Sequence, residues 1–235
     1  MSTTLKEKQS EILELDMQSK MNMIHNMDCL EFMKQVPDNY FDLVLTDPPY
    51  GINESGQTNK TRGCLAKSKD YGNKTWDKQK IDKIYFDEMI RISKNTIVFG
   101  ANHFIDRLPI NSSCWLVWDK QNGATDFADS ELAWTNFKTA VRNYKFKWQG
   151  MLQQDMANKE VRHHPTQKPT ELFKMILRDY AIKLDKKTVF DPFMGSGTTA
   201  IACKSLGLDW CGCELEKDYV EIANKRLEQV QGSLF

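Results

Sequence analysis

The chain has 235 residues, of which 40% are hydrophobic and 27% are charged. This length is enough for one substantial α/β domain and too short for two domains with separate cores. The composition is that of a folded globular protein and excludes a disordered or membrane-embedded chain. Basic and acidic residues number 32 each, so any contact with nucleic acid would have to come from local basic segments.

The start of the chain gives no sign of export. Residues 1–20 are polar and mixed in charge, without the apolar segment and the small-residue cleavage site of a secretory signal. We expect a cytoplasmic protein without membrane contact, with an N-terminal extension over 1–20 and a single domain over 21–235.

The cysteines show no paired spacing typical of a zinc site, and several lie inside apolar runs. We therefore expect buried free thiols and no metal. The six cysteines are Cys29, Cys64, Cys114, Cys203, Cys211 and Cys213.

Short apolar runs alternate with amphipathic stretches along the chain. The expected strands are Met21–His25, Phe41–Thr46, Thr96–Phe99, Cys114–Trp118, Glu131–Thr135, Thr188–Phe190 and Trp210–Cys213. Apolar residues at helical spacing predict covering helices over 172–180 and 216–230. This alternation favours an α/β fold with a doubly wound, mostly parallel, seven-stranded sheet covered on both faces.

Two polar segments interrupt the alternation. Residues 51–80 are rich in Gly, Asn, Thr and Lys, which predicts a long mobile basic loop. Residues 138–163 are also basic and place Tyr144, Phe146 and Trp148 between their charges.

The first motif with chemical meaning is Asp47-Pro48-Pro49-Tyr50, which directly follows the expected strand Phe41–Thr46. This position is the carboxyl edge of the sheet, where α/β folds bind ligands. The prolines stiffen the turn and supply no backbone donors, so carbonyl oxygens there can act as acceptors. The alternative interpretation is a rigid turn with a capping Asp47.

This turn suits the methylation of an amine attached to an aromatic base, whose nitrogen is a poor nucleophile. The Asp47 carboxylate and the Pro48 carbonyl could each accept one N–H, which would aim the nitrogen lone pair at a methyl donor. Tyr50 offers a stacking face for a base rotated out of a duplex.

The second motif is a glycine turn between an expected strand and a helix. It reads Phe190-Asp191-Pro192-Phe193-Met194-Gly195-Ser196-Gly197-Thr198-Thr199. Glycines let the backbone approach a ligand, and a helix N-terminus offers unpaired N–H groups. Glu214 closes the next strand, where its carboxylate could accept both hydroxyls of a ribose. Together these features predict a nucleoside pocket.

Enzymes that use nicotinamide share this arrangement of strand, turn, helix and acidic residue. The glycine turn alone therefore cannot separate hydride transfer from methyl transfer. The run from Asp47 to Tyr50 separates them, because hydride transfer has no use for two amine-hydrogen acceptors beside an aromatic ring.

At these residues the sequence resembles the β-class of DNA amino-methyltransferases, in which the Asp-Pro-Pro-Tyr motif precedes the glycine-rich cofactor motif. His164-Pro165-Thr166-Gln167-Lys168-Pro169 is similar to a third hallmark of that family. The resemblance extends from Met21 to about Leu227. It implies a Rossmann-like, circularly permuted fold and transfer of a methyl group from S-adenosyl-L-methionine to the N6 amine of adenine in double-stranded DNA, with base flipping.

The resemblance also implies roles for individual residues. The target-base site would comprise Asp47, Pro48, Pro49 and Tyr50. The cofactor site would comprise Asp28, Cys29, Asp47, Lys168, Asp191, Phe193, Gly195, Ser196, Gly197, Thr198 and Glu214.

Four of the cofactor residues have more specific expected contacts. Asp28 would accept a hydrogen bond from the adenine amine of the cofactor, and Glu214 would bind its ribose. Asp191 would lie near the amino acid moiety, and Lys168 would reach the carboxylate. The alternative for Asp28 is a helix N-cap before 29–35.

Two adjacent histidines, His163 and His164, are expected to be turn and packing residues rather than metal ligands. Little chain is available between Trp134 and His164 for a separate target-recognition domain, so DNA recognition would fall to 51–80 and 138–163. The alternative for each segment is a solvated basic face.

Other functions remain open at this point. The acceptor could be the N4 amine of cytosine, although the cytosine enzymes of the family more often carry Ser in place of Asp47. Methylation of RNA or of a protein amide is a second alternative. A non-catalytic DNA-binding module is a third, against which the intact Asp47 and Tyr50 argue. The resemblance also makes a homodimer and a cognate restriction endonuclease candidate partners.

Overall fold

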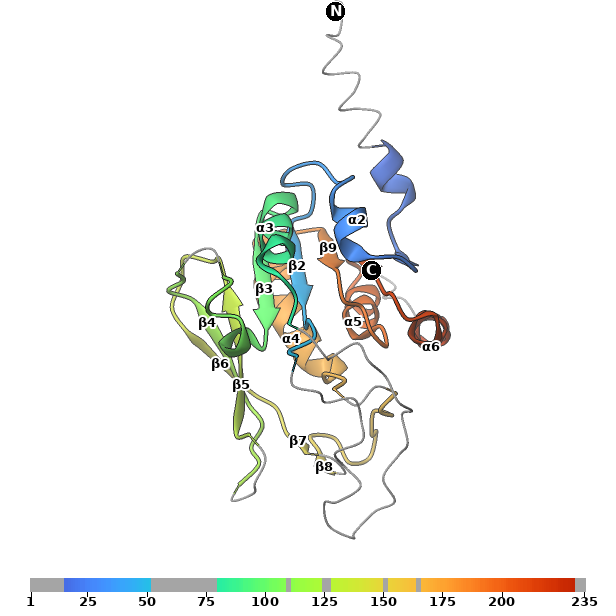
Figure 1. Ribbon diagram of the computed structural model, residues 1–235. Coiled ribbons are helices and arrows are strands. Elements are labelled where there is room, and N and C mark those ends of the chain that lie inside the picture. Colours follow the sequence, from blue (N-terminus) through green and yellow to red (C-terminus); the bar gives the residue numbers. More distant parts are fainter. Residues whose placement is uncertain are drawn as a thin grey trace, which may run out of the picture.

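The computed structural model describes residues 15–51, 80–108, 111–123, 128–149, 152–163 and 166–230. Over these ranges it shows an eight-stranded sheet with helices on both faces, and a separate two-stranded sheet (Figure 1). The expected basic loop 51–80 lies outside the described residues except at its ends, and so do Cys64 and His164.

The main sheet places the glycine-turn strand near its middle. The strand order is β1 (Met23–His25), β10 (Asp209–Cys213), β9 (Thr188–Asp191), β2 (Leu43–Thr46), β3 (Thr96–Phe99), β5 (Ser130–Thr135), β4 (Trp115–Asp119) and β6 (Arg142–Lys145). β5 runs antiparallel to both neighbours, whereas all other pairings in this sheet are parallel. The prediction of a doubly wound, mostly parallel α/β sheet is confirmed.

The strand order also agrees with the expected circular permutation. Outward from the centre of the sheet, β9, β10 and β1 are successive neighbours, although β1 comes first in the sequence and β10 last. Joining the chain ends would make these three strands consecutive. On the other side of β9, the parallel strand β2 continues to β3. The chain therefore leaves the β9–β2 pair in opposite directions, which creates a ligand-binding crevice at the carboxyl ends of these strands.

The prediction of seven strands is wrong by one, because β6 adds an eighth. Its sequence, Arg142-Asn143-Tyr144-Lys145, buries only Tyr144, so no apolar run marks this edge strand. It pairs with β4, and the short antiparallel strands β7 (Trp148–Gln149) and β8 (Leu152–Gln153) follow it. Part of the segment 138–163 is thus a sheet edge rather than a loop.

Alternating side chains on the central strands divide the core between the two faces of the sheet. The helices are α2 (Cys29–Met33), α3 (Lys83–Ile92), α4 (Thr170–Tyr180), α5 (Thr198–Ser205) and α6 (Lys217–Glu228), with short 3-10 helices η2 (Ala101–His103) and η3 (Ile182–Leu184). Leu43 and Leu45 belong to the cluster that contains α4 and α5 residues. Val44 belongs to the cluster formed with α2 and α3. Burial on both faces explains why β2 is apolar throughout.

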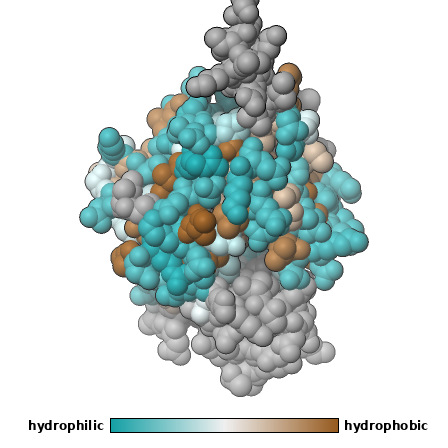
Figure 2. Space-filling view, turned by 45° about the horizontal axis from the view of Figure 1, so that its top comes forward, coloured by the Kyte–Doolittle hydropathy of each residue, from teal (hydrophilic) through white to brown (hydrophobic). Residues whose placement is uncertain are grey.

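The N-terminal part of the described chain packs on the same domain. Residues 15–19 are helical, and Met17 is 1% exposed within the cluster that contains α2 and α3. Part of the expected extension over 1–20 is therefore anchored in the core. Figure 2 shows a largely hydrophilic face on which apolar residues are scattered.

The five cysteines within the described ranges are buried and free, as expected. None of the helices described has the length and apolar character needed to cross a membrane. In the same ranges, no group of His, Cys, Asp and Glu side chains is arranged to hold a metal ion.

Candidate functional site

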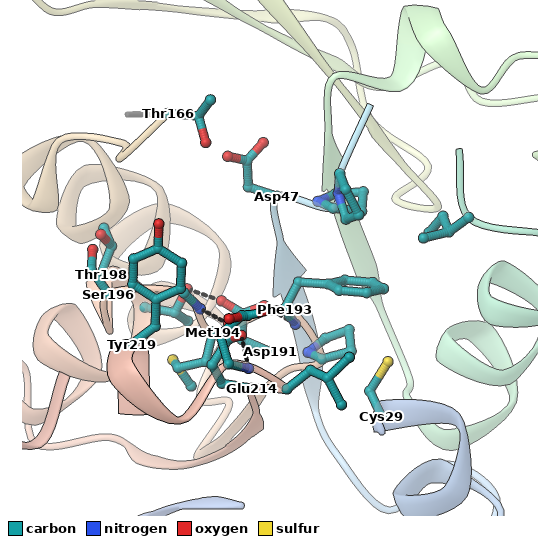
Figure 3. A pocket seen from close by; sticks show the side chains of 18 of the residues that line it. Cys29, Asp47, Thr166, Asp191, Phe193, Met194, Ser196, Thr198, Glu214 and Tyr219 are labelled. Atoms are coloured by element: carbon teal, nitrogen blue, oxygen red, sulfur yellow. Dashed lines mark hydrogen bonds between the residues drawn. The ribbon is translucent and has the colours of Figure 1, made fainter. Parts of the chain in front are cut away.

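A cavity of about 380 Å³ opens at the carboxyl ends of β2, β9 and β10, which is within the usual size range of small-molecule sites. Both sequence motifs line it. Asp47 lies toward one end and Cys29 toward the other, with Phe193 and Glu214 between them (Figure 3). The predicted residues that line the cavity are Asp28, Cys29, Asp47, Pro48, Pro49, Tyr50, Lys168, Asp191, Phe193, Gly195, Ser196, Thr198 and Glu214.

Gly197 is the one predicted residue that is not part of this lining. It is the N-cap of α5 and has a left-handed φ of 88°. A Cβ at this position would lie 2.8 Å from the Cβ of Ala223 on α6. Gly197 therefore shapes the turn and allows α5 and α6 to pack closely.

Glu214 fixes the glycine turn from the neighbouring strand. Its Oε2 accepts a hydrogen bond from the backbone N–H of Gly195 at 2.7 Å, and its Oε1 accepts one from the backbone N–H of Glu216 at 2.8 Å. Burial raises the pKa of Glu214. Because each carboxylate oxygen has two lone pairs, Glu214 can still accept hydroxyl hydrogens from a ligand in the cavity.

Asp191 links β9 to β2, the two strands from which the chain leaves in opposite directions. Its Oδ1 accepts hydrogen bonds from the Thr46 hydroxyl at 2.7 Å and the Phe193 N–H at 3.0 Å, and its Oδ2 accepts from the Thr199 hydroxyl. Burial raises the pKa of Asp191 to about 6, although these hydrogen bonds oppose the increase. Asp191 is thus a structural link as well as a cavity residue, and its contact with a cofactor stays a prediction.

Asp28 is a helix N-cap, which was the alternative interpretation of this residue. Its Oδ1 accepts the backbone N–H of Leu30 at 2.7 Å at the start of α2. Asp28 nevertheless lines the cavity together with Cys29. Burial raises the pKa of the Cys29 thiol far above its usual range, so this side chain is a neutral part of the wall.

The Asp47 carboxylate is held by two donors. Its Oδ1 accepts a hydrogen bond from the Tyr50 hydroxyl, and its Oδ2 accepts one from Lys168 Nζ at 2.7 Å. Burial raises the pKa of the Asp47 carboxyl group, and the positive charge of Lys168 opposes this increase. Lys168 therefore belongs to the Asp47 side of the cavity, while its expected contact with the cofactor carboxylate stays a prediction.

The Tyr50 ring is fixed by residues that follow β3. It stacks on His103 of η2 with ring centroids 4.9 Å apart and planes inclined by 18°, and its edge meets Phe104. Gly100, with φ 65°, lets the backbone approach so closely that an added Cβ would overlap the Tyr50 ring. The tyrosine is thus held in a fixed position in the cavity wall.

Two further charged side chains extend the Asp47–Lys168 pair. Lys168 Nζ lies 3.1 Å from Glu131 Oε2, and Lys120 Nζ forms an ion pair with Glu131 Oε1 at 2.5 Å. Burial alone would lower the pKa of Lys168, but Asp47 and Glu131 outweigh it and raise the pKa. Burial likewise favours a high pKa for Glu131, yet Lys168 and Lys120 lower it. Lys168 and Glu131 are therefore both charged.

The segment that carries Lys168 is tied to the glycine turn. Glu160 accepts hydrogen bonds from the Thr170 N–H at 2.9 Å and from Gln167 Nε2 at 2.9 Å. Arg226 of α6 pairs with Glu160 at 2.9 Å and also donates to the Ser196 hydroxyl at 3.1 Å. His163 donates its backbone N–H to Gln167 Oε1 at 2.8 Å, and its role as a turn and packing residue stays a prediction.

The sequence interpretation missed Glu131, Lys120 and His103 as neighbours of the site. Glu131 is the first residue of an expected strand and Lys120 follows another, but strand periodicity does not reveal that β5 runs antiparallel. This reversal brings the first residues of β5 to the edge where the parallel strands end. His103 lies in a short 3-10 helix after β3, for which the sequence pattern gives no signal.

Comparisons with known proteins agree with this geometry. A family model described as DNA methylase, whose name covers the N6 and N4 enzymes, matches residues 117–225. The type II methyltransferase M.HinfI of Haemophilus influenzae is 28% identical over 256 residues, covering 90% of this chain and 69% of the relative. The type II methyltransferase M2.DpnII of Streptococcus pneumoniae is 27% identical over 250 residues, covering 89% and 90%.

Solved structures share the fold. The complex of M1.HpyAVI with SAM has a TM-score of 0.53 at 24% identity, covering 87% of this chain and 99% of that one. The cytosine-N4-specific PvuII DNA methyltransferase has a TM-score of 0.55 at 16% identity, covering 92% and 91%. Together with the site and the fold, the family model and the type II methyltransferase relatives support a DNA amino-methyltransferase.

Proposed function

We propose that this chain transfers a methyl group from S-adenosyl-L-methionine to the N6 amine of adenine in double-stranded DNA. The observation that carries this proposal is that the Asp47–Tyr50 turn and the glycine turn line one continuous cavity. A nucleoside-type cofactor in one part of the cavity would therefore lie next to a base held at Asp47.

The cavity residues fit the proposed cofactor. Glu214 presents a fixed carboxylate in the middle of the cavity, where ribose hydroxyls can donate to it. Phe193 and Tyr85, with ring centroids 6.1 Å apart, supply aromatic surface for the adenine ring. When bound, the cofactor supplies the electrophilic methyl group.

The target base would be held by the residues after β2. The Asp47 carboxylate accepts one amine hydrogen and the Pro48 carbonyl the other, so the nitrogen lone pair is directed away from the base ring. Donors already occupy both Asp47 oxygens, but each oxygen can accept a second hydrogen bond. Tyr50, stiffened by its stack on His103, supports the flipped base.

The N4 amine of cytosine is the second candidate acceptor, because the matching family includes enzymes for both amines. Adenine is favoured by Asp47 itself, since the cytosine enzymes of the resembling class more often carry Ser at this position. Both acceptors need the same pair of hydrogen-bond acceptors, so the nucleoside product decides between them.

Contact with double-stranded DNA would come from the segments 51–80 and 138–163. Within the second segment, Lys138, Arg142 and Lys145 are exposed near the sheet edge. Exposed basic side chains of this kind can neutralise phosphates even on a chain without net charge. A homodimer, a cognate restriction endonuclease and a cytoplasmic location stay predictions.

The test is incubation of the protein with methyl-labelled S-adenosylmethionine and mixed-sequence duplex DNA, followed by digestion and nucleoside analysis. The proposal expects label in N6-methyladenine. Label in N4-methylcytosine would mean that cytosine, not adenine, is the acceptor base, and the proposed class of DNA amino-methyltransferase would stand. Label found in RNA or protein in parallel incubations, with none in DNA, would contradict the proposal.

A further inference from the structure

Lys168 lies between two carboxylates in the wall of the cavity. Its Nζ is 2.7 Å from Asp47 Oδ2 and 3.1 Å from Glu131 Oε2, and its side chain is only 5% exposed. The other Glu131 oxygen is bound by Lys120. Negative and positive charges therefore alternate along a line that begins at Asp47, in the target-base site, and ends at Lys120.

Separate elements of the fold build this line. Asp47 follows β2, Lys120 follows β4, and Lys168 precedes α4. Glu131 reaches the same edge because it lies at the beginning of the antiparallel strand β5. Ion pairs to two carboxylates on separate elements fix the position of the Lys168 ammonium more firmly than a single ion pair would.

The second carboxylate changes what Lys168 does to Asp47. A buried ammonium paired with Asp47 alone would neutralise that carboxylate and compete with an amine for its lone pairs. With Glu131 present, the positive charge is shared, and Asp47 keeps more of its capacity to accept the hydrogens of a base amine.

We propose that Glu131 is a positioning residue for methyl transfer, acting through Lys168 to hold Asp47 in place as a strong hydrogen-bond acceptor. This inference rests on the proposed function. Glu131 does not itself line the cavity, whereas Lys168 and Asp47 do.

The charged and titratable groups around Asp47 define the expected response to pH. Lys168 and Tyr50 contact Asp47 directly, and Glu131 lies behind Lys168 with Lys120 as its outer partner. Asp191, at the end of β9, acts from a greater distance. Among the described residues, the titratable side chain of His103 also lies nearby, stacked on the Tyr50 ring.

The first measurement is single-turnover methyl transfer by Glu131→Gln, which keeps the size of the side chain and removes its charge. The rate should fall by about tenfold to a hundredfold, the scale expected for a misplaced reacting group. Affinity for S-adenosylmethionine should stay within about threefold, because Glu131 does not line the cavity. Glu131→Asp should restore part of the rate by restoring the charge.

A matched control is Glu88→Gln. Glu88 forms a 2.7 Å ion pair with Arg91 on α3, and its side chain is 18% exposed, close to the 21% of Glu131. Its replacement should leave the methyl-transfer rate unchanged. An unchanged rate in folded Glu131→Gln would overturn the proposal. If Glu131→Gln does not fold, a wild-type rate in Glu131→Asp would overturn it, because the shorter side chain draws the carboxylate away from Lys168.

The second measurement does not depend on turnover. Glu131 raises the pKa of Asp47 through its negative charge, so Glu131→Gln should lower the midpoint of the Asp47 carboxylate in an NMR titration of the unliganded protein. The acidic limb of the methyl-transfer rate should move to lower pH in the same variant. A slower variant with an unmoved midpoint would indicate a merely structural role and overturn the proposal.

The two proposals fail in different ways. Wild-type protein that binds S-adenosylmethionine but methylates no DNA would refute the proposed function, and with it the role of Glu131 in methyl transfer. Active wild-type protein that is indifferent to Glu131→Gln in both measurements would refute the inference alone.

Discussion

Replacement of Lys168 by Met removes a buried positive charge and nearly preserves the volume of the side chain. Asp47 and Glu131 then face each other without the ammonium group that lies 2.7 and 3.1 Å from them. Removing one partner of a buried ion pair costs about 3–5 kcal/mol, because the remaining charge is desolvated without compensation.

Two features reduce this cost here. The Asp47 and Glu131 side chains keep 18% and 21% exposure, so water can solvate part of each carboxylate. Glu131 also keeps its contact with Lys120. We therefore expect Lys168→Met to lower the free energy of unfolding at neutral pH by about 2–4 kcal/mol, which corresponds to a decrease in Tm of about 5–12 °C.

The pH dependence follows from the direction of the pKa changes. Without Lys168, burial and mutual repulsion raise the folded-state pKa of Asp47 and Glu131 above the unfolded value of about 4. Below the unfolded-state pKa, both carboxyl groups are protonated in the folded and in the unfolded state. The loss in free energy of unfolding of Lys168→Met relative to wild type is therefore small at such pH values. This loss in free energy of unfolding grows as pH rises from about 4 through the folded-state pKa, and it reaches its full size above that pKa.

Denaturant unfolding at several pH values measures this effect. Lys94→Met is the control, because Lys94 forms an ion pair with Asp42 while its own side chain is 56% exposed, and such a pair contributes at most about 1 kcal/mol. A Lys168→Met protein within about 0.5 kcal/mol of wild type at neutral pH would refute the reasoning.

Two further predictions concern the halves of the cavity. Glu214→Ala should weaken binding of S-adenosylmethionine by about 1.5–3 kcal/mol, the range for hydrogen bonds to charged groups, and calorimetry showing unchanged affinity would remove Glu214 from the cofactor site. Gly100→Ala should displace the Tyr50 ring and slow methyl transfer, whereas Gly207→Ala, at a similar φ of 67° but with open space around it, should not. Equal rates in the two alanine variants would contradict the assigned position of Tyr50.

Much of the architecture was predictable because it depends on local patterns. The core strands of the sheet are apolar runs buried on both faces, and they appear where the sequence predicts them. The strand β6 was missed because an edge strand with a single buried side chain, Tyr144, resembles a polar loop.

The cavity lining was largely predictable for a related reason. The Asp47 turn and the glycine turn both follow apolar strands, and parallel strands bring their carboxyl ends to one edge. Glu131 could not be assigned in the same way, since its place at this edge depends on the direction of β5, which the alternation of side chains leaves open. The contact of Lys168 with Asp47 spans 121 positions in the sequence and has no local signal.

The most direct test of the central claim is the single-turnover rate of methyl transfer by Asp47→Ala, measured with the affinity for S-adenosylmethionine on the same preparation. Removal of a group that stabilises the transition state should lower the rate by at least about a hundredfold, with cofactor affinity within about threefold of wild type. Near-normal methyl transfer by this variant would contradict the claim that Asp47 holds the target amine.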